Sequence, residues 1–275
     1  MKKNILVPTD FSNNALHAAY YACQLALITD LDIHLFHCYT TQSATTLNDT
    51  ESLKADVLMA ELKAQLEKQY PLLVITTECV SRLLTDVLPD VATEPNFALI
   101  VMGTTGEGKG KSLLWGSNTS YITSVSQIPV IAIPNVSSKL STEKVAILTN
   151  FKAEEIETLN NYLKFVSSIN QLDIIHIYRS TKKEKEIYEQ LQDWSFNIKQ
   201  LHGINQVNII AHPVEPNNES LDTIPEVINH IISQNEYDSI LVTKTRKSFF
   251  KRLVTTSVSR EITLHLLKPT FFDKI

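Results

Sequence analysis

At 275 residues the chain is longer than most single domains, so we expect two domains. Hydrophobic residues make up 43% of the sequence and charged residues 20%, as in globular proteins with a packed core. The lack of long apolar runs argues against a membrane-spanning helix. The formal charge of −5 argues against a nucleic-acid partner and leaves small anionic ligands open.

The predicted elements of the first half alternate between short apolar strands and longer amphipathic helices. Strands are expected near residues 4–8, 32–38, 72–78, 97–102 and 129–133, and helices near 12–28, 51–69, 81–93 and 117–127. Ser12 is the predicted N-cap of the first helix. Continuously apolar strands such as ALIVM are typical of a parallel sheet covered on both faces, so each half is predicted to be a doubly wound α/β sandwich.

The sequence contains an internal repeat, with an offset near 140 residues between the two copies. ILVPTDF at 5–11 lies over VAILTNF at 145–151, and residues 97–129 lie over 237–269 without a gap. LFHCY at 35–39 also resembles IIHIY at 174–178. This ordered set of matches predicts a tandem duplication of two domains, 1–138 and 139–275, joined near a polar loop at 135–142.

The cysteines and the first residues indicate a cytoplasmic protein. Cys23, Cys38 and Cys79 are odd in number and widely spaced, which fits neither a disulfide framework nor a zinc site. The opening MKKNILVPTDFS lacks the apolar run and cleavage site of a signal peptide. We therefore expect a cytoplasmic location, no membrane association and no metal bound by the protein itself.

Five of the six glycines lie in the stretch GTTGEGKGKSLLWGS at residues 103–117. This stretch follows a predicted buried strand and precedes a predicted helix. Ligands of open α/β sheets bind beyond the carboxyl ends of the strands, and a helix start offers N–H groups to an anion. Glycine allows a positive φ and a close approach of phosphate to the backbone. The stretch therefore predicts an anion site.

Two common phosphate motifs fail on this stretch. The P-loop pattern G-x4-G-K-[ST] puts its first glycine on Thr105 in one frame and its hydroxyl on Gly110 in the other. The Rossmann pattern G-x-G-x-x-G has no full match. The pattern G-x2-G-x9-G-[ST] fits completely, with Gly103, Gly106, Gly116 and Ser117.

That spacing resembles the nucleotide loop of the ATP-binding universal stress proteins. VPTDFS resembles the first strand of this family, which ends in an aspartate, here Asp10, and HLFHCY resembles the second strand, which ends around Cys38. IPVIAIP resembles the fifth strand. The resemblance runs through both halves and is more specific in the first. It implies two five-stranded parallel sheets of order 3-2-1-4-5, with the adenine-nucleotide alpha-hydrolase-like architecture.

The same resemblance implies ATP or ADP as the ligand, with Mg²⁺ bound through the phosphates. Pro8, Thr9 and Asp10 would border the adenosine, and Cys38 would meet the base through its main chain. Glycines would shape the turn around ribose and phosphates, and the start of the following helix would hold the phosphates with N–H and hydroxyl donors. The implied cofactor-binding set is Pro8, Thr9, Asp10, Cys38, Met102, Gly103, Gly106, Gly116, Ser117, Asn118 and Thr119.

The second half lacks this set. Asn150 stands opposite Asp10, and the five glycines are replaced by Thr243, Arg246, Ser248, Phe250 and Thr256. If the three motif glycines need a left-handed backbone, these side chains cost about 3–6 kcal/mol, or two to four decades in affinity. We expect one working site, in the first half. Three interpretations of the basic segment Thr243–Leu253 stay open: an altered anion site, a partner surface or a solvated loop face.

Other candidate residues have ordinary structural interpretations. His37 and His176 occupy matched places and are expected to share a packing role rather than to bind a metal. Cys38 is expected to be a small core residue rather than a reactive thiol. Trp115 is expected to anchor the loop by burial, and Lys109 and Lys111 would add only charge to it. The sequence indicates no catalytic residue.

The sequence thus predicts a regulatory protein of the stress response that binds ATP or ADP and has at most slow ATP hydrolysis. The two halves are expected to pair through their fifth strands as a pseudo-dimer. A homodimer and an unknown protein partner stay open. One alternative is an ATP-using enzyme of the adenine-nucleotide alpha-hydrolase-like group, and another is an interaction module with a vestigial loop.

Overall fold

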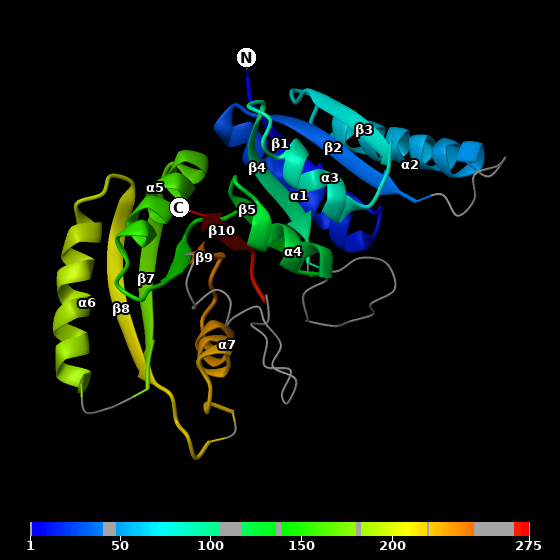
Figure 1. Cartoon of the computed structure of the whole chain (residues 1–275). Helices are drawn as coiled ribbons and strands as arrows, with labels where there is room; N and C mark the ends of the chain where they lie inside the picture. The colour runs from blue at the N-terminus through cyan, green and yellow to red at the C-terminus, as the bar shows by residue number, and fades with distance from the viewer. Residues whose placement is uncertain are drawn as a thin grey trace. The chain divides into compact units, whose positions relative to one another are not determined.

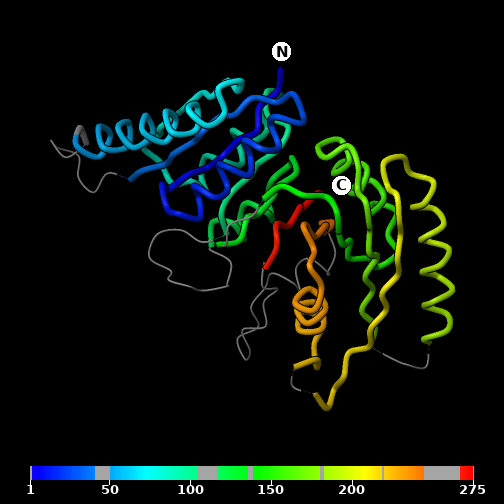
Figure 2. Tube along the Cα trace, turned by 180° about the vertical axis from the view of Figure 1, so that it is seen from behind, coloured from blue at the N-terminus to red at the C-terminus, as the bar shows by residue number. Residues whose placement is uncertain are grey.

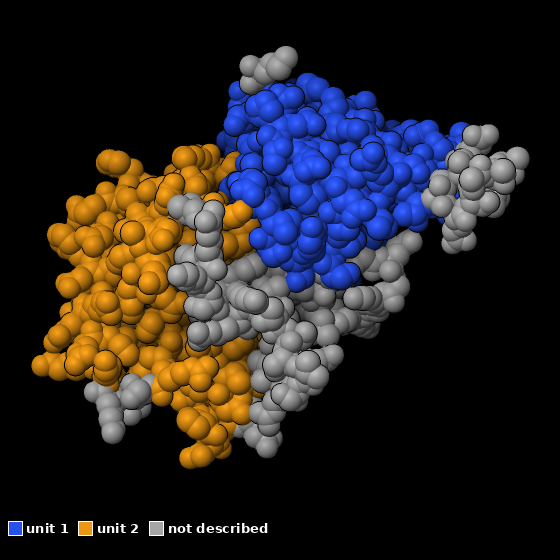
Figure 3. All heavy atoms as spheres, in the orientation of Figure 1, with its two compact units in different colours: residues 1–140 blue, residues 141–275 orange. Residues whose placement is uncertain are grey.

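The structure is a computed structural model that describes residues 2–40, 48–104, 117–135, 139–179, 183–218, 220–244 and 267–274. The chain divides into two compact units, Met1–Leu140 and Ser141–Ile275 (Figure 3). No helix among the described residues is long and apolar enough to cross a membrane.

The first unit is a five-stranded parallel sheet with the strand order β3-β2-β1-β4-β5 (Figure 1). Its strands are β1 (Asn4–Pro8), β2 (Asp32–Tyr39), β3 (Ile75–Ser81), β4 (Phe97–Gly103) and β5 (Val130–Ile133). Its helices are α1 (Asn13–Thr29), α2 (Asn48–Gln69), α3 (Leu84–Val91) and α4 (Ser117–Val125).

The second unit repeats this arrangement, with the order β8-β7-β6-β9-β10. Its strands are β6 (Lys144–Leu148), β7 (Ile169–Tyr178), β8 (Ile204–Pro213), β9 (Ser239–Lys244) and β10 (Thr270–Lys274). Its described helices are α5 (Ala153–Val166), α6 (Glu184–Lys199) and α7 (Ile224–Gln234). Figures 1 and 2 show α6 lying along β8. The prediction of two doubly wound sandwiches of order 3-2-1-4-5 is confirmed.

The central strands are buried on both faces, as their continuous apolar runs predict. Ile5, Leu6 and Val7 of β1 are fully buried, and the four residues of β5 are also buried. Helix α1 begins after Ser12, whose Oγ accepts a hydrogen bond from the Ala15 N–H at 3.2 Å, as expected for its N-cap. The buried face of α1 is rich in alanine, which lets the helix approach the sheet closely.

The third strand of the first unit lies further along the chain than the sequence predicts. The apolar run LLVI suggests a strand at 72–78, but β3 begins at Ile75, which is paired with Ile33 of β2. Leu72 and Val74 are 87% and 57% exposed. The prediction was wrong here because exposed apolar residues before an edge strand look like strand residues in the sequence.

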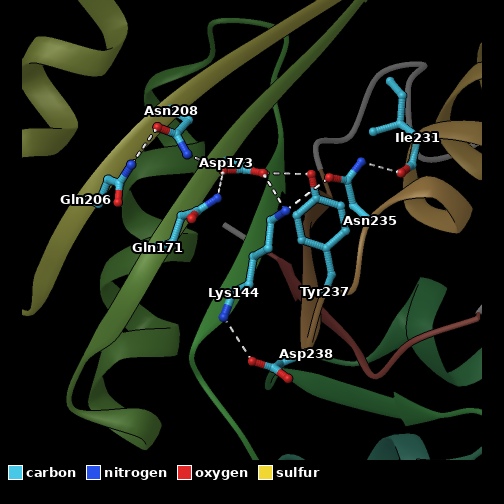
Figure 4. Close-up of polar contacts among 9 residues, drawn as sticks. All are labelled: Lys144, Gln171, Asp173, Gln206, Asn208, Ile231, Asn235, Tyr237 and Asp238. Carbon is cyan, nitrogen blue, oxygen red and sulfur yellow. Dashed lines mark hydrogen bonds and ion pairs between the residues drawn. The ribbon is translucent and has the colours of Figure 1, made fainter.

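A buried polar network lies near the amino ends of β6 and β9 in the second unit (Figure 4). The Asp173 carboxylate is 2% exposed and accepts hydrogen bonds from Tyr237 Oη at 2.9 Å, Gln171 Nε2 at 2.8 Å and Asn208 Nδ2 at 2.9 Å. The Lys144 ammonium lies 3.8 Å from the same carboxylate. These donors satisfy a charge that would be costly to bury alone.

The first unit has a histidine and an aromatic ring in the matched place, and the histidine Nδ1 atom lies 2.8 Å from Thr76 Oγ1. There His34 stands where Asp173 stands in the second unit, and its ring lies 5.4 Å from that of Phe97, which stands in the place of Tyr237. Both residues differ between the units, with histidine and phenylalanine in the first and aspartate and tyrosine in the second. The units therefore keep one backbone plan with different polar cores.

Candidate functional site

The carboxyl ends of β1 and β4 lie side by side in the first unit. The two strands are parallel neighbours, with Leu6 opposite Ile100. The residues that follow β1, Thr9 and Asp10, therefore lie at the same edge of the sheet as Gly103. On its other side β1 pairs with β2. The strand order therefore runs in opposite directions on the two sides of the boundary between β1 and β4. This is the switch point at which open α/β sheets bind ligands.

The turn after β1 fixes the position of the Asp10 carboxylate. Asp10 Oδ1 accepts a hydrogen bond from the Ser12 N–H at 3.1 Å, and Thr9 Oγ1 accepts one from the Phe11 N–H at 3.0 Å. Phe11 between them has a φ of 62°, in the left-handed region. The Thr9 N–H donates to the Phe36 carbonyl of β2 at 2.9 Å, which ties the turn to the sheet. Asp10 is partly exposed at this edge.

Gly103 is required by a close approach to α1 rather than by a left-handed backbone. Its φ is outside the positive range, but a Cβ at this position would lie 2.7 Å from Asn14 Oδ1 and 2.9 Å from Asn14 Cγ. Asn14 is 2% exposed and donates from Nδ2 to the Ile133 carbonyl at 3.0 Å. The assumption that all three motif glycines need a left-handed backbone was therefore wrong for Gly103.

The sequence reasoning missed Asn14. It lies in the first turn of α1, and its bond to Ile133 joins this helix to β5. The Thr104 N–H donates to the same Ile133 carbonyl at 2.9 Å. An asparagine among the alanines of a predicted helix was the available signal.

The start of α4 is tied to the end of β4 through Thr119. The Thr119 hydroxyl donates to the Gly103 carbonyl at 2.7 Å, and Thr119 is 3% exposed. A hydroxyl contact from Thr119 to phosphate would require this bond to break. Ser117 and Asn118 are exposed in the first turn of α4, where backbone N–H groups lack partners within the helix.

The remaining described site residues lie on the strands around this point. Pro8 is buried and is paired with Phe36, and Met102 of β4 is 4% exposed. Cys38 is partly exposed near the end of β2. Burial raises the pKa of its thiol to about 12, and the Glu78 carboxylate acts in the same direction. Cys38 is therefore a neutral thiol at physiological pH, which agrees with a structural side chain.

Part of the predicted loop lies outside the described residues. This holds for Gly106, Gly116 and the loop residues Lys109, Lys111 and Trp115. It also holds for most of the basic segment in the second half, including Arg246, Ser248 and Phe250, and for Thr256 after it. Among the described residues, no group of three or more histidine, cysteine or acidic side chains is placed to hold a metal ion.

The second unit repeats the turn but fills it with a carboxylate of its own. The Phe151 N–H donates to Thr149 Oγ1 at 2.9 Å, and Phe151 has a φ of 60°. The Glu155 carboxylate then accepts hydrogen bonds from the Thr149 hydroxyl at 2.5 Å and from the Asn150 N–H at 2.8 Å. Glu155 is 4% exposed, and burial raises the pKa of its carboxyl group. The matched residue of the first unit is Ala15.

The end of β9 also differs from the end of β4. Thr243 stands where Gly103 stands in the first unit, is 6% exposed, and shares a hydrogen bond with the Thr158 hydroxyl at 2.8 Å. In the first unit Asn14 lies in the matched space beside Gly103. In the second unit both sides of the switch point are therefore occupied by the chain's own side chains.

These observations define a class of protein, a tandem pair of doubly wound α/β units. The sequence model described as "Universal stress protein family" matches residues 1–134, and the first unit belongs to that family. Comparison of the chain with curated proteins gives no match.

Solved structures extend this fold to the whole chain. A universal stress protein from Archaeoglobus fulgidus DSM 4304 is 17% identical with a TM-score of 0.68, and the match covers 98% of both chains. A putative universal stress protein from Pseudomonas aeruginosa UCBPP-PA14 is 14% identical with a TM-score of 0.59, covering 99% of this chain and 93% of the other. Universal stress protein UspA from Lactobacillus plantarum is 26% identical over 48% of this chain and 97% of its own, with a TM-score of 0.40.

Proposed function

We propose that the first unit binds ATP or ADP at the carboxyl ends of β1 and β4. In this proposal the whole chain is a cytoplasmic regulatory protein of the stress response. The observation that carries this proposal is the convergence of Asp10, Gly103 and the start of α4 at the switch point of a unit that belongs to the universal stress protein family. The family's loop pattern of Gly103, Gly106, Gly116 and Ser117 is complete in this unit.

Each group has a task in this proposal. The Asp10 carboxylate accepts hydrogen bonds from the ribose hydroxyls, because its turn holds it at the sheet edge. The N–H groups at the start of α4 bind phosphate oxygens, to which a helix start is electrostatically suited. Mg²⁺ enters with the nucleotide through its phosphates. We propose no dedicated catalytic group, so nucleotide occupancy is the signal and hydrolysis is slow or absent.

The second unit is proposed not to bind nucleotide. Its loop glycines are replaced, and the buried Glu155 carboxylate takes the Asn150 N–H and the Thr149 hydroxyl. The pairing of the two units through their fifth strands, and any homodimer or protein partner, stay predictions.

The test is nucleotide binding with matched variants in the two turns. Protein purified without added nucleotide is denatured and analysed for released adenine nucleotide, and ATP is titrated into the wild type by calorimetry. Asp10→Asn removes the charge of the proposed ribose acceptor. Hydrogen bonds to charged groups contribute about 1.5–3 kcal/mol, so we expect affinity to fall by roughly 10- to 150-fold. Asn150→Ala is the matched control in the second unit and should leave the affinity unchanged.

The loop assignment is tested by a second pair of changes. The double variant Gly106→Arg, Gly116→Thr introduces the residue types that stand opposite these glycines in the second half, Arg246 and Thr256. It should abolish nucleotide binding. Wild-type protein that neither carries nor binds adenine nucleotide would refute the proposal. Binding that survives in the loop variant would refute the assignment to the loop.

A further inference from the structure

The turn after the first strand is built in both units around a histidine. His37 Nδ1 lies 2.7 Å from the Thr9 carbonyl oxygen, and His176 Nδ1 lies 2.9 Å from the Thr149 carbonyl oxygen. A carbonyl oxygen only accepts, so the Nδ1 atom of each ring carries the proton and donates it. In each unit the histidine comes from the neighbouring strand, β2 or β7, and so holds the turn from the side.

The same ring packs against the aromatic residue at the centre of the turn. The centroids of the His37 and Phe11 rings are 4.4 Å apart, at an interplanar angle of 42°. The His176 and Phe151 rings are 4.6 Å apart, at 39°. Each histidine therefore holds its turn at two points, the carbonyl before it and the aromatic ring within it.

The aromatic residue needs this support because its backbone is left-handed. The φ angles of Phe11 and Phe151 are 62° and 60°, a conformation that residues with side chains adopt at a cost. In the first unit this conformation turns the chain directly after Asp10, and it lets the Ser12 N–H reach Asp10 Oδ1 at 3.1 Å. The direction of the Asp10 carboxylate thus depends on the conformation of Phe11.

We propose that His37 and Phe11 are positioning residues for nucleotide binding in the first unit. His37 fixes the Thr9 carbonyl and the Phe11 ring, and the turn so fixed holds Asp10 in the direction that the ribose requires. This inference rests on the proposed function. His37 acts through Asp10 and need not touch the nucleotide.

The duplication supplies a matched control for this role. His176 makes the same hydrogen bond and the same ring contact in a turn that carries Asn150 in place of Asp10. Because only the first unit is proposed to bind nucleotide, a change at His176 measures what the loss of these contacts costs in stability alone. A positioning role for His37 predicts a loss of nucleotide affinity that depends on Asp10.

The experiment compares His37→Leu and His176→Leu in the full chain. Leucine keeps an apolar side chain of similar bulk but removes the donor to the carbonyl. Both changes should lower the urea midpoint of their own unit by similar amounts. ATP affinity measured by calorimetry should fall about tenfold in H37L and should stay within about twofold of wild type in H176L. If H37L does not fold, His37→Asn replaces it, because asparagine keeps an N–H donor while removing the ring from Phe11.

A second readout separates positioning from general loosening of the unit. In an Asp10→Asn background the carboxylate is already absent, so H37L should weaken ATP binding no further. Equal losses with and without Asp10 would overturn the positioning role, as would wild-type affinity in H37L or in its asparagine replacement. Wild-type protein that fails to bind ATP would overturn the proposed function together with this inference. Binding by the wild type with an unaffected H37L would overturn this inference alone.

Discussion

Replacing Gly103 by alanine tests the packing of β4 against the first turn of α1. The added Cβ would lie 2.7 Å from Asn14 Oδ1, 2.9 Å from Asn14 Cγ and 3.1 Å from the Asn14 backbone carbonyl carbon. Asn14 is 2% exposed and bonded to the Ile133 carbonyl, so it has little room to move aside. Overpacking in a well-packed region costs about 1–3 kcal/mol, and we expect this loss in the free energy of unfolding of the first unit.

A double-mutant cycle assigns that loss to Asn14. Asn14→Ala removes the two nearest atoms and also the hydrogen bond to Ile133, which contributes about 1 kcal/mol. In the double variant most of the clash is absent, so the two single losses together should exceed the double loss by about 1 kcal/mol or more. The 3.1 Å contact to the Asn14 backbone keeps the relief incomplete.

Urea unfolding followed by tryptophan fluorescence can report each unit separately. The chain has two tryptophans, Trp115 in the first half and Trp194 in the second, so Trp194→Phe leaves a reporter in the first half and Trp115→Phe leaves one in the second. Gly203→Ala is the contrast, because Gly203 has a φ of 90° and its Cβ would meet the Ser167 carbonyl oxygen at 2.7 Å. It should destabilise the second unit with no coupling to Asn14. Strict additivity of Gly103→Ala and Asn14→Ala would refute the reasoning.

Four further outcomes are expected. Tyr237→Phe removes a donor to the buried Asp173 carboxylate and should destabilise the second unit by about 1–3 kcal/mol in urea, whereas unchanged stability would show that the network does not need this hydroxyl. Ser12→Ala removes the N-cap of α1 and should cost the first unit about 1 kcal/mol by the same measurement, with Ser12→Asp retaining most of it. The Cys38 thiol, with its pKa raised to about 12, should resist iodoacetamide at about pH 8 until the protein is denatured, and rapid labelling of folded protein in mass spectra would contradict this. Burial lowers the pKa of His176, so its contribution to the stability of the second unit should be full above about pH 6.5 and should decline as the pH falls toward the lowered value. The decline should be smaller in His176→Leu, and identical pH profiles would exclude His176 as its source.

Most of the fold could be predicted because the physical signals are local and repeated. The strand at 4–8 and the cap at Ser12 were found from an apolar run and a capping residue, and both lie where expected. The duplication then transferred each assignment from one half to the other. The third strand was displaced because strand pairing at a sheet edge is set by partners on β2 rather than by the apolar run itself.

The chemistry of the candidate site was less predictable because it depends on contacts between distant segments. The sequence singled out Gly103 for its place in a loop, but the structural reason is Asn14, 89 residues earlier in the chain. Glu155 reads as an ordinary acidic residue in the first turn of a helix, whereas its carboxylate closes the turn of the second unit. Neither contact leaves a pattern within one segment.

Comparison of the two turns separates what the fold requires from what a ligand would require. The left-handed phenylalanine, the threonine that caps it and the histidine clamp are present in the second unit, which lacks the loop glycines and the aspartate. These features build the turn in both units, and in the first unit the same turn holds Asp10. Asp10 and Gly103 are found only in the first unit, and Glu155 fills the corresponding turn of the second. A function confined to one unit needs at least one residue that differs between the units, and Asp10 is the proposed one, held by turn contacts that both units share.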